Sequence, residues 1–246
     1  MIVFTGDTHA DFTRFFNGNW DSMTKDDYVI ICGDFGGVWN GSPQENRMLD
    51  KLEKLPFTLL FVCGNHDNFN LLYNHPVKEW HGGLVHEVRP HILHLMRGEI
   101  FDIDGYKVFT MGGAKSHDIS DGILDPNNPN YRRQKRRLDN EGKFLYRILG
   151  KSWWPEEQPT EDELLQGGYH LHQVNRKVDF IVSHEGPTSL VAQLGYDNLD
   201  IYPLMEFLEE VKQKCQYKRW FFGHHHLNHN FDDKHTMLWL GTVEVN

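Results

Sequence analysis

The sequence predicts a layered α/β fold, and three observations lead to this prediction. Short, continuous apolar runs recur along the chain, and helix-like segments lie between several of them. Hydrophobic residues make up 39 % of the 246 residues, which is enough for a sizeable core and excludes an intrinsically disordered chain. Layered α/β domains often reach this length, so we expect residues 1–246 to form a single domain.

The clearest strand signals are apolar runs of four to six residues that end in a polar loop. Continuous runs of this kind are typical of strands covered on both faces. They occupy residues 2–5, 28–32, 58–63, 178–183 and 219–222. Further strand signals lie at 84–88, 91–96, 99–103 and 106–111, with Asp104-Gly105 as a hairpin turn. Residues 236–245 are interpreted as a last strand or hairpin.

Three segments show the start signals or the periodicity of helices. Residues 43–55 follow Ser42, a candidate N-cap, and place Pro43 at the first helical position. Residues 160–177 begin with Thr160 and Glu163, which have the spacing of a capping box. Residues 200–215 repeat apolar side chains with the 3.6-residue period of a helix. Helices that alternate with strands support the layered α/β prediction.

Residues 114–159 interrupt this alternation. The stretch is polar, contains Asp-Pro and Asn-Pro pairs and the basic run 132–137, and includes Trp153-Trp154-Pro155 near its end. It is too long for an ordinary connection. We interpret it as an insertion over one end of the sheet and as a candidate lid.

Charge and composition exclude several classes of protein. The 25 Lys and Arg residues face 35 Asp and Glu, a net charge of −10, whereas general binders of nucleic acid or anionic membranes are normally basic. The sequence contains no apolar run long enough to span a membrane. Its first residues lack the basic and apolar regions of a signal peptide, so we expect a cytoplasmic protein. Three widely spaced cysteines favour neither a disulfide framework nor a zinc knuckle.

Polar residues that can bind metal follow the predicted strands. In chain order they are Asp7-Thr8-His9, Gly33-Asp34, Gly64-Asn65-His66-Asp67, His184 and Gly223-His224-His225-His226. Sheets of α/β proteins expose such loops around a common crevice. Glycine before a ligand lets the backbone turn sharply. Carboxylate, imidazole and amide groups suit a divalent transition ion, so the pattern predicts a metal site.

These motifs resemble the signature of the calcineurin-like metallophosphoesterase superfamily, which runs DxH, GDxx[DG], GNH[DE], H and GHxH. All five blocks are present in order, and the resemblance extends from Asp7 to His226. It implies a four-layer α/β/β/α sandwich with two mixed β-sheets and an active site at their loop edge. It also implies two divalent metal ions. We expect manganese, although iron, zinc, cobalt and nickel accept the same ligands.

The resemblance further implies a role for each matching residue. The first ion would be held by Asp7, His9 and His226, the second by Asn65, His184 and His224, and Asp34 would bridge both. His225 would stay outside the ligand set, either in solvent or behind the ligands.

His66 and Asp67 are the candidate catalytic residues. The resemblance puts His66 beside the leaving group, as a proton donor or as a cation that stabilises the transferring phosphoryl group. The alternative is a histidine that only orders the loop. Asp67 would either orient a neighbour by a hydrogen bond or cap the loop.

The implied activity is phosphoester hydrolysis by direct attack of a hydroxide that bridges the two ions. Protein phosphatases of the superfamily extend the second block to GDxVDRG. Here Gly37 and Val38 stand where those enzymes have an aspartate and a phosphate-clamping arginine. We therefore expect phosphodiesters as substrates, or small phosphomonoesters whose phosphate another cation holds.

Three alternatives remain at this point. A serine/threonine-type phosphoprotein phosphatase is disfavoured by the missing arginine. A non-catalytic scaffold is disfavoured because all seven ligands and His66 are present. A nucleic-acid-binding module built on the run 132–137 is disfavoured by the overall acidity, so no stable nucleic-acid partner is expected. The oligomeric state stays open.

The insertion supplies candidate substrate-binding residues, namely Lys115, His117, Arg132 and Arg133. Tyr131, Trp153 and Trp154 are available for stacking, and aromatic groups near cations suit a nucleotide-like or other planar phosphate ester. The alternative is a solvated surface loop anchored by a buried tryptophan. Our hypothesis is that the insertion covers the metal site and sets the substrate choice.

Overall fold

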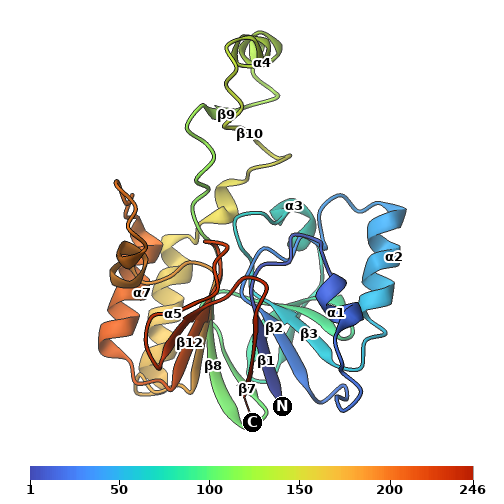
Figure 1. Ribbon diagram of the computed structural model, residues 1–246, viewed down its shortest axis with the longest axis vertical. Coiled ribbons are helices and arrows are strands. Elements are labelled where there is room, and N and C mark those ends of the chain that lie inside the picture. Colours follow the sequence, from blue (N-terminus) through green and yellow to red (C-terminus); the bar gives the residue numbers. More distant parts are fainter. Residues whose placement is uncertain (246) are drawn as a thin grey trace.

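The computed structural model describes residues 1–245, which form two β-sheets lying face to face. Helices cover the outer face of each sheet, so the body of the protein has four layers (Figure 1). Both sheets contain parallel and antiparallel pairs. The predicted α/β/β/α sandwich with two mixed sheets is therefore confirmed.

The first sheet has the strand order β15-β1-β2-β3-β6-β5-β4. Its strands are β1 (Ile2–Thr5), β2 (Tyr28–Ile31), β3 (Thr58–Phe61), β4 (Val77–Trp80), β5 (Gly83–Arg89), β6 (Ile92–Leu95) and β15 (Thr242–Val245). β1, β2, β3 and β6 pair in parallel, so their carboxyl ends meet at one edge. Helices α1 (Thr13–Asn17) and α2 (Pro43–Leu52) lie on the outer side, and α3 (Phe69–Leu72) lies near the loop edge (Figure 1).

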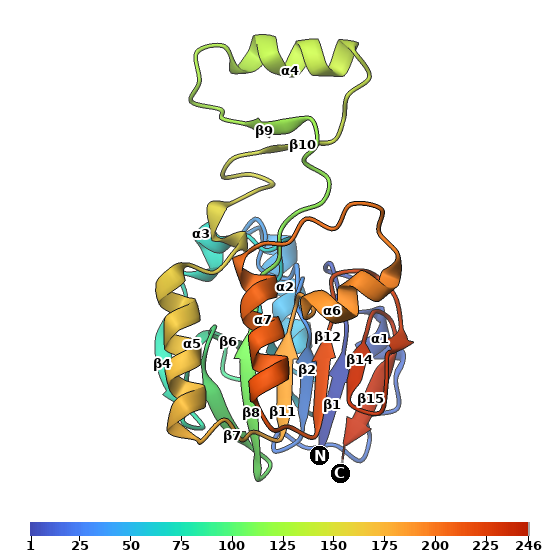
Figure 2. The same ribbon diagram turned by 90° about the vertical axis from the view of Figure 1, so that its left-hand side faces the viewer.

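The second sheet has the order β13-β14-β12-β11-β8-β7. Its strands are β7 (Ile100–Ile103), β8 (Tyr106–Met111), β11 (Phe180–Ser183), β12 (Arg219–Phe222), β13 (His229–Asn230) and β14 (His235–Met237). The pairs β8/β11, β11/β12 and β12/β14 are parallel. Helices α5 (Glu161–Gln173) and α7 (Pro203–Lys214) cover its outer face, and the short α6 (Thr188–Val191) and a 3₁₀ turn (Ala192–Leu194) follow β11 (Figure 2).

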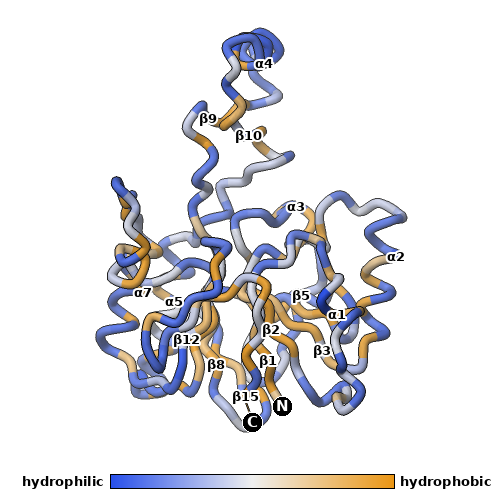
Figure 3. Tube along the Cα trace, viewed as in Figure 1, coloured by the Kyte–Doolittle hydropathy of each residue, from blue (hydrophilic) through white to orange (hydrophobic). Residues whose placement is uncertain are grey.

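The core is divided among the layers because successive side chains of a strand point to opposite faces. In β2, Val29 and Ile31 pack with residues of α1 and α2, whereas Ile30 packs between the sheets against β11 and β12. A third cluster lies between the second sheet and α7. Figure 3 shows hydrophobic residues gathered along the strands. The central strands are thus buried on both faces, as their continuous apolar runs predict.

The prediction for residues 236–245 is wrong. β14 belongs to the second sheet and β15 to the first, so the segment is neither one strand nor a hairpin. Between them, the backbone N–H groups of Trp239 and Gly241 donate to the side-chain oxygen of Asn228 at 2.9 and 3.0 Å. A side chain therefore takes donors that a continuous strand would use in its ladder, and the chain crosses from one sheet to the other.

The insertion forms an arm that projects away from the sheets (Figures 1 and 2). It contains β9 (Gly122–Leu124), which pairs in parallel with β10 (Tyr146–Ile148), and the mostly hydrophilic α4 (Tyr131–Asn140) at its outer end. The chain returns to the body through a 3₁₀ turn (Pro155–Glu157), where Trp154 is buried in the first core cluster. Within residues 1–245, no helix has the length and apolar character that crossing a membrane requires.

Candidate metal centre

The predicted ligands lie on loops that follow five strands, β1, β2, β3, β11 and β12. Parallel pairing aligns the carboxyl ends of these strands within each sheet. The two facing sheets bring both sets of loops to one edge, where side chains separated by more than 200 residues are in contact. Strand polarity thus explains why ligands scattered along the chain meet.

Three glycines that precede ligands make room for a ligand from another strand. A Cβ atom on any of them would lie 2.0 or 2.1 Å from a ligand side-chain atom, which is far inside contact distance. The pairs are Gly33 with His184, Gly64 with Asp34, and Gly223 with Asp7. The glycines therefore serve the packing of the ligands against one another, in addition to the sharp turn that the sequence predicts.

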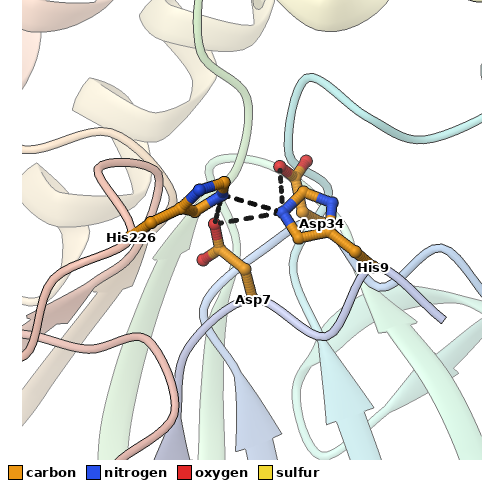
Figure 4. Close-up of side chains that lie close together, drawn as sticks. All are labelled: Asp7, His9, Asp34 and His226. Atoms are coloured by element: carbon orange, nitrogen blue, oxygen red, sulfur yellow. Dashed lines mark hydrogen bonds and ion pairs between the residues drawn. The ribbon is translucent and has the colours of Figure 1, made fainter. Parts of the chain in front are cut away.

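The first ligand group brings together Asp7, His9, Asp34 and His226, whose ligand atoms all lie within 4.8 Å of one another (Figure 4). His226 Nε2 is 3.3 Å from Asp7 Oδ2, and His9 Nε2 is 2.9 Å from His226 Nε2. Asp7 and Asp34 are buried, whereas His9 and His226 are partly open to solvent. This arrangement can hold a cation at the floor of an accessible site.

The second group lies deeper and shares Asp34 with the first. His184 Nε2 is 3.2 Å from Asn65 Oδ1 and 3.4 Å from Asp34 Oδ2. The His224 ring packs edge-on against the His184 ring with centroids 5.0 Å apart. Asp34 Oδ2 is also 3.6 Å from His9 Nε2, so one carboxylate oxygen faces both groups. All seven predicted metal ligands therefore converge.

Backbone strain marks the same loops. His9, Asp34, His224 and His226 all adopt positive φ angles, between 44° and 70°. Non-glycine residues rarely occupy this left-handed region, and such conformations persist where surrounding structure holds them. Four of the seven ligands are thus held in costly conformations that aim their side chains at the centre.

The donor set fits a bound cation. Asp7 Oδ2 and His224 Nε2 are buried side-chain atoms without a hydrogen-bond partner among residues 1–245. Such atoms are costly unless something satisfies them. Although burial opposes the charged form, Asp34 and Asp7 raise the pKa of His184 to about 10, so the folded site attracts positive charge. Imidazole and carboxylate donors of this kind suit a divalent transition ion.

Asn65 is oriented by a chain of buried polar groups. Its Nδ2 donates to Ser116 Oγ at 3.2 Å, and Ser116 Oγ donates to Glu157 Oε2 at 2.6 Å. Glu157 also accepts from the Ser116 backbone N–H at 3.0 Å. Because the amide nitrogen is engaged, the amide oxygen of Asn65 is directed at the centre. Hydrogen bonds behind metal ligands commonly fix their orientation in this way.

Glu185 lies beside the ligand candidate His224 on the other side of the centre. Its carboxylate accepts from Tyr202 OH at 2.6 Å and from His225 Nε2 at 3.0 Å, and it lies 3.7 Å from His224 Nε2. Burial alone would raise the pKa of Glu185, but the neighbouring His224 and His225 lower it by more. The net pKa lies below its usual value, so the group is a buried anion. His225 thus lies behind the ligands, which was one of the two predicted placements.

The two candidate catalytic residues differ in their surroundings. His66 borders the cavities at the centre, and its backbone N–H donates to Asp34 Oδ1 at 2.7 Å. Burial lowers the pKa of His66, with an opposing contribution from Asp34. Asp67 is buried and accepts from the backbone N–H groups of Gly64 at 2.8 Å and Gly36 at 3.2 Å. These contacts correspond to the loop-capping alternative for Asp67.

Comparison with known proteins identifies the family. A family model for calcineurin-like phosphoesterases matches residues 1–228. The chain belongs to the calcineurin-like phosphoesterase family. The resemblance predicted from the sequence is therefore confirmed, and membership places the chain among phosphoester hydrolases.

Individual relatives of this calcineurin-like phosphoesterase are distant. It is 21 % identical over 276 aligned residues to a lariat debranching enzyme from Drosophila pseudoobscura pseudoobscura, which covers 92 % of this chain and 42 % of the relative. The chain thus spans less than half the length of that protein. A solved phosphopantetheinyl hydrolase from Mycobacterium tuberculosis aligns with a TM-score of 0.43 and 14 % identity over 97 % of this chain and 87 % of that one. A putative 5'-nucleotidase from Staphylococcus aureus gives the same TM-score and identity over 97 % and 48 %.

Two positions distinguish this calcineurin-like phosphoesterase from the protein phosphatases of its superfamily. A Cβ at Gly37 would lie 2.5 Å from the Phe35 ring and 3.1 Å from the Phe12 ring, so the loop leaves no room for an aspartate. Val38 is buried in the first core cluster. The side chain at position 38 thus packs into the core, and no arginine extends from this position to the centre.

The structure separates the four candidate substrate-binding residues of the insertion. The His117 ring stacks on the ligand His224 with centroids 4.5 Å apart. Lys115 forms an ion pair with Asp200 and borders a neighbouring cavity. Arg132 and Arg133 are exposed on α4, at the outer end of the arm (Figure 2), and the structure does not bring them to the centre.

Another cation of the arm borders the cavity next to the centre. Arg147 on β10 borders the same cavity as His9 and His66, and its Nε donates to Asp118 Oδ1 at 3.0 Å. The second hydrogen bond of this pair joins Arg147 Nη2 to Asp118 Oδ2, so the two limbs of the arm are tied at its base. Sequence reasoning missed Arg147, Glu157 and Glu185, because no motif or spacing distinguishes them from surface charges.

Three cavities form a row over the ligands. The middle one, about 350 Å³, is lined by Asp34, Asn65 and four histidines of the ligand loops, namely His66, His224, His225 and His226. It shares His66 with a cavity of about 550 Å³ and shares His117 and Tyr196 with a cavity of about 430 Å³. A molecule centred on the ligands therefore has space on two sides.

Proposed function

We propose that the chain hydrolyses phosphodiesters at a two-metal centre, with small phosphomonoesters as secondary substrates. The observation that carries this proposal is the position of Asp34 Oδ2, 3.6 Å from His9 Nε2 and 3.4 Å from His184 Nε2. Two divalent ions would supply a water of lowered pKa as nucleophile and would offset the negative charge of the phosphoryl group. The first ion would be held by Asp7, His9 and His226, the second by Asn65, His184 and His224, and Asp34 would contact both. Manganese is the first ion to test.

Direct attack by water is supported by the burial of the two cysteines that follow β2 and β3. Cys32 and Cys63 are buried, and burial raises the pKa of Cys63 to about 12. A thiol that is protonated at neutral pH and closed to solvent is a poor nucleophile. We therefore propose a single displacement at phosphorus without a covalent phospho-enzyme.

The preference for diesters is supported by the space and the cations around the centre. A phosphodiester carries two substituents, and the middle cavity opens into one cavity on the His66 side and another on the His117 side. A monoester dianion would favour a free bidentate arginine. Val38 is buried where protein phosphatases carry theirs, and Arg147 already pairs with Asp118. The phosphoprotein phosphatase alternative lacks this clamp.

His66 is proposed to assist departure of the leaving group. Its ring borders both the middle cavity and the 550 Å³ cavity, so a leaving group in the latter would pass beside it. A proton delivered there matters most when the departing alkoxide is basic. Asp67, with its hydrogen bonds to two backbone amides, is proposed to fix the loop that carries His66.

The proposal is tested by metal analysis and paired substrates. The purified chain loaded with Mn²⁺ should contain close to two ions per chain, and it should hydrolyse bis(4-nitrophenyl) phosphate with a higher kcat/KM than 4-nitrophenyl phosphate. Asp34→Asn should lose nearly all turnover and bind fewer ions. Full metal content without hydrolysis of either ester would refute the enzymatic proposal, and a strong monoester preference would refute the diester assignment.

The role of His66 is tested with leaving groups of different basicity. His66→Ala should retain both ions, and its rate should fall mainly for esters of poor leaving groups such as phenol or methanol. An equal loss for 4-nitrophenyl and phenyl esters would contradict a role in protonating the leaving group. His66→Gln serves as the matched variant that retains hydrogen-bonding capacity but cannot transfer a proton near neutral pH.

A further inference from the structure

The 550 Å³ cavity beside His66 has an apolar wall that contributes none of the seven predicted metal ligands. On the side away from the ligands it is lined by Phe12, Trp39 and Met48, which come from three separate segments of the first sheet's outer layer. Phe12 is only 3 % exposed, and Trp39 and Met48 are partly exposed. The wall is therefore an apolar, largely aromatic surface within reach of the reacting centre.

The tryptophan in this wall is held in place by several contacts. The Glu45 carboxylate accepts the backbone N–H groups of Trp39, Asn40 and Gly41 at 2.9, 2.8 and 2.9 Å. Asn68 Nδ2 donates to the Trp39 carbonyl oxygen at 2.7 Å. The loop that carries Trp39 is thus fixed both by the first turn of α2 and by the segment before α3.

The indole ring itself is also anchored. Trp39 packs edge-on against the buried Trp154, with ring centroids 5.5 Å apart and an interplanar angle of 82°. One side of the ring rests on the core, and the ring also lines the cavity. A rigid, partly exposed tryptophan offers a large contact area at little cost in conformational entropy, which is the property of an anchor for aromatic ligands.

The base of the arm borders the opposite side of the cavity. Arg147 borders this side from β10, and its charge is paired with Asp118. The carboxylate of Glu45, which also lines the cavity, is occupied by three backbone N–H groups. No unpaired cation of the arm is therefore offered to a second anionic group here. The cavity accommodates one bulky ring system between the Trp39 wall and the Arg147 side.

We propose that this cavity is the leaving-group subsite of the enzyme and that it selects esters of aromatic alcohols. The name of the subsite rests on the proposed function, because only a phosphoryl group at the metal centre makes its neighbour beside His66 a leaving group. The aromatic preference rests on Trp39, Phe12 and Met48 alone. The two parts can therefore fail separately.

Binding without turnover tests the aromatic preference. The ligands are 1-naphthylmethyl phosphonate and cyclohexylmethyl phosphonate, which have the same charge and a C–P bond that resists hydrolysis. Isothermal titration of the Mn²⁺-loaded chain should show at least tenfold tighter binding of the naphthyl ligand. Trp39→Ala should reduce this ratio to below threefold, and Trp39→Phe should retain most of it. Trp80→Ala, on β4 in the same sheet, is the matched control and should keep the full ratio.

A second variant covers the case in which Trp39→Ala fails to fold. Met48→Trp places a larger side chain in the cavity from α2 and should weaken the naphthyl ligand at least fivefold. Equal binding of the two ligands to the wild-type chain, a full ratio in Trp39→Ala, or an unchanged naphthyl affinity in Met48→Trp would overturn the subsite. Aromatic selectivity that depends on Trp39 in a chain without esterase activity would support the pocket and refute the proposed function.

Discussion

Gly64→Ala is expected to damage the metal centre much more than the fold. The Cβ of alanine would lie 2.0 Å from Asp34 Oδ1 and 2.5 Å from the Asp34 backbone nitrogen. Protein Cβ atoms essentially never approach another heavy atom closer than 3.0 Å. The carboxylate that faces both ligand groups must therefore move by about 1 Å, and the backbone contact prevents a simple rotation of the side chain from relieving the clash.

The expected magnitudes differ for activity and stability. A misplacement of about 1 Å in a catalytic group costs about 100-fold in rate, so kcat for a diester should fall by at least that factor. Overpacking of a buried site costs about 1–3 kcal/mol. For a chain of this length, each kcal/mol lowers Tm by about 2–4 °C.

The assay combines metal content, diester hydrolysis and thermal unfolding of the same preparation. Gly168→Ala is the matched control, because Gly168 lies inside α5 and a Cβ there would be 3.9 Å from the nearest atom, Phe207 Cε2. That variant should keep full activity and gain up to about 1 kcal/mol of stability. Gly64→Ala with two bound ions and more than one third of the wild-type turnover would refute the packing argument.

Three further predictions follow from the structure. Ser116→Ala removes the acceptor of Asn65 Nδ2, so metal affinity in a Mn²⁺ titration should fall about 10–100-fold, and an unchanged affinity would contradict the orienting role. Burial lowers the pKa of His86 to about 4 and that of its hydrogen-bonded partner His94 well below its usual value, with Tyr73 stacked on His86. The unfolded chain then binds more protons below pH 6.5, so stability is full above that pH and decreases as the pH falls toward 4, by about 1–2 kcal/mol for His86 at pH 5. Urea unfolding with chelator at pH 7 and 5 checks this, and the double variant His86→Phe/His94→Phe should lose the part of the difference that these two histidines contribute. Chelation should lower Tm and Mn²⁺ should restore it. Bound Mn²⁺ should raise the free energy of unfolding by about 2.7 kcal/mol when free metal is 100 times Kd, and a Tm that changes with neither treatment would count against a metal centre.

Strand polarity explains why so much of the centre could be predicted from sequence. Each ligand follows an apolar run, and an apolar run of four to six residues is a local signal. Parallel strands then deliver their carboxyl ends to one edge, so Asp7, Asp34 and Asn65 meet without any need to know the loop conformations. The order of the strands in the two sheets was not readable, because pairing depends on contacts between residues far apart in the chain.

The residues that orient the ligands were out of reach for the same reason. Ser116 and Glu157 are 41 residues apart, and the hydrogen bonds that join Ser116 to Glu157 and to Asn65 exist only after the arm has left the body and returned. The basic run 132–137 drew attention to α4, yet the cation of the arm that borders the cavity beside His9 and His66 is Arg147 on the short strand β10. A dense run of charges along a sequence indicates a solvent-exposed segment. Whether one of its charged residues lies at the site depends on how the arm folds back toward the body.

The ligand loops and the central strands should differ in local stability. Two buried carboxylates, four ligands with positive φ and two buried polar atoms that make no hydrogen bond within residues 1–245 all cost free energy in the folded chain. That cost is offset elsewhere, by central strands that are buried on both faces. A cation that satisfies the carboxylates and imidazoles removes part of the cost locally. The ligand loops should therefore be the least stable part of the metal-free protein, and bound metal should slow hydrogen exchange in residues 33–36 and 223–226 before it changes exchange in β2 or β11.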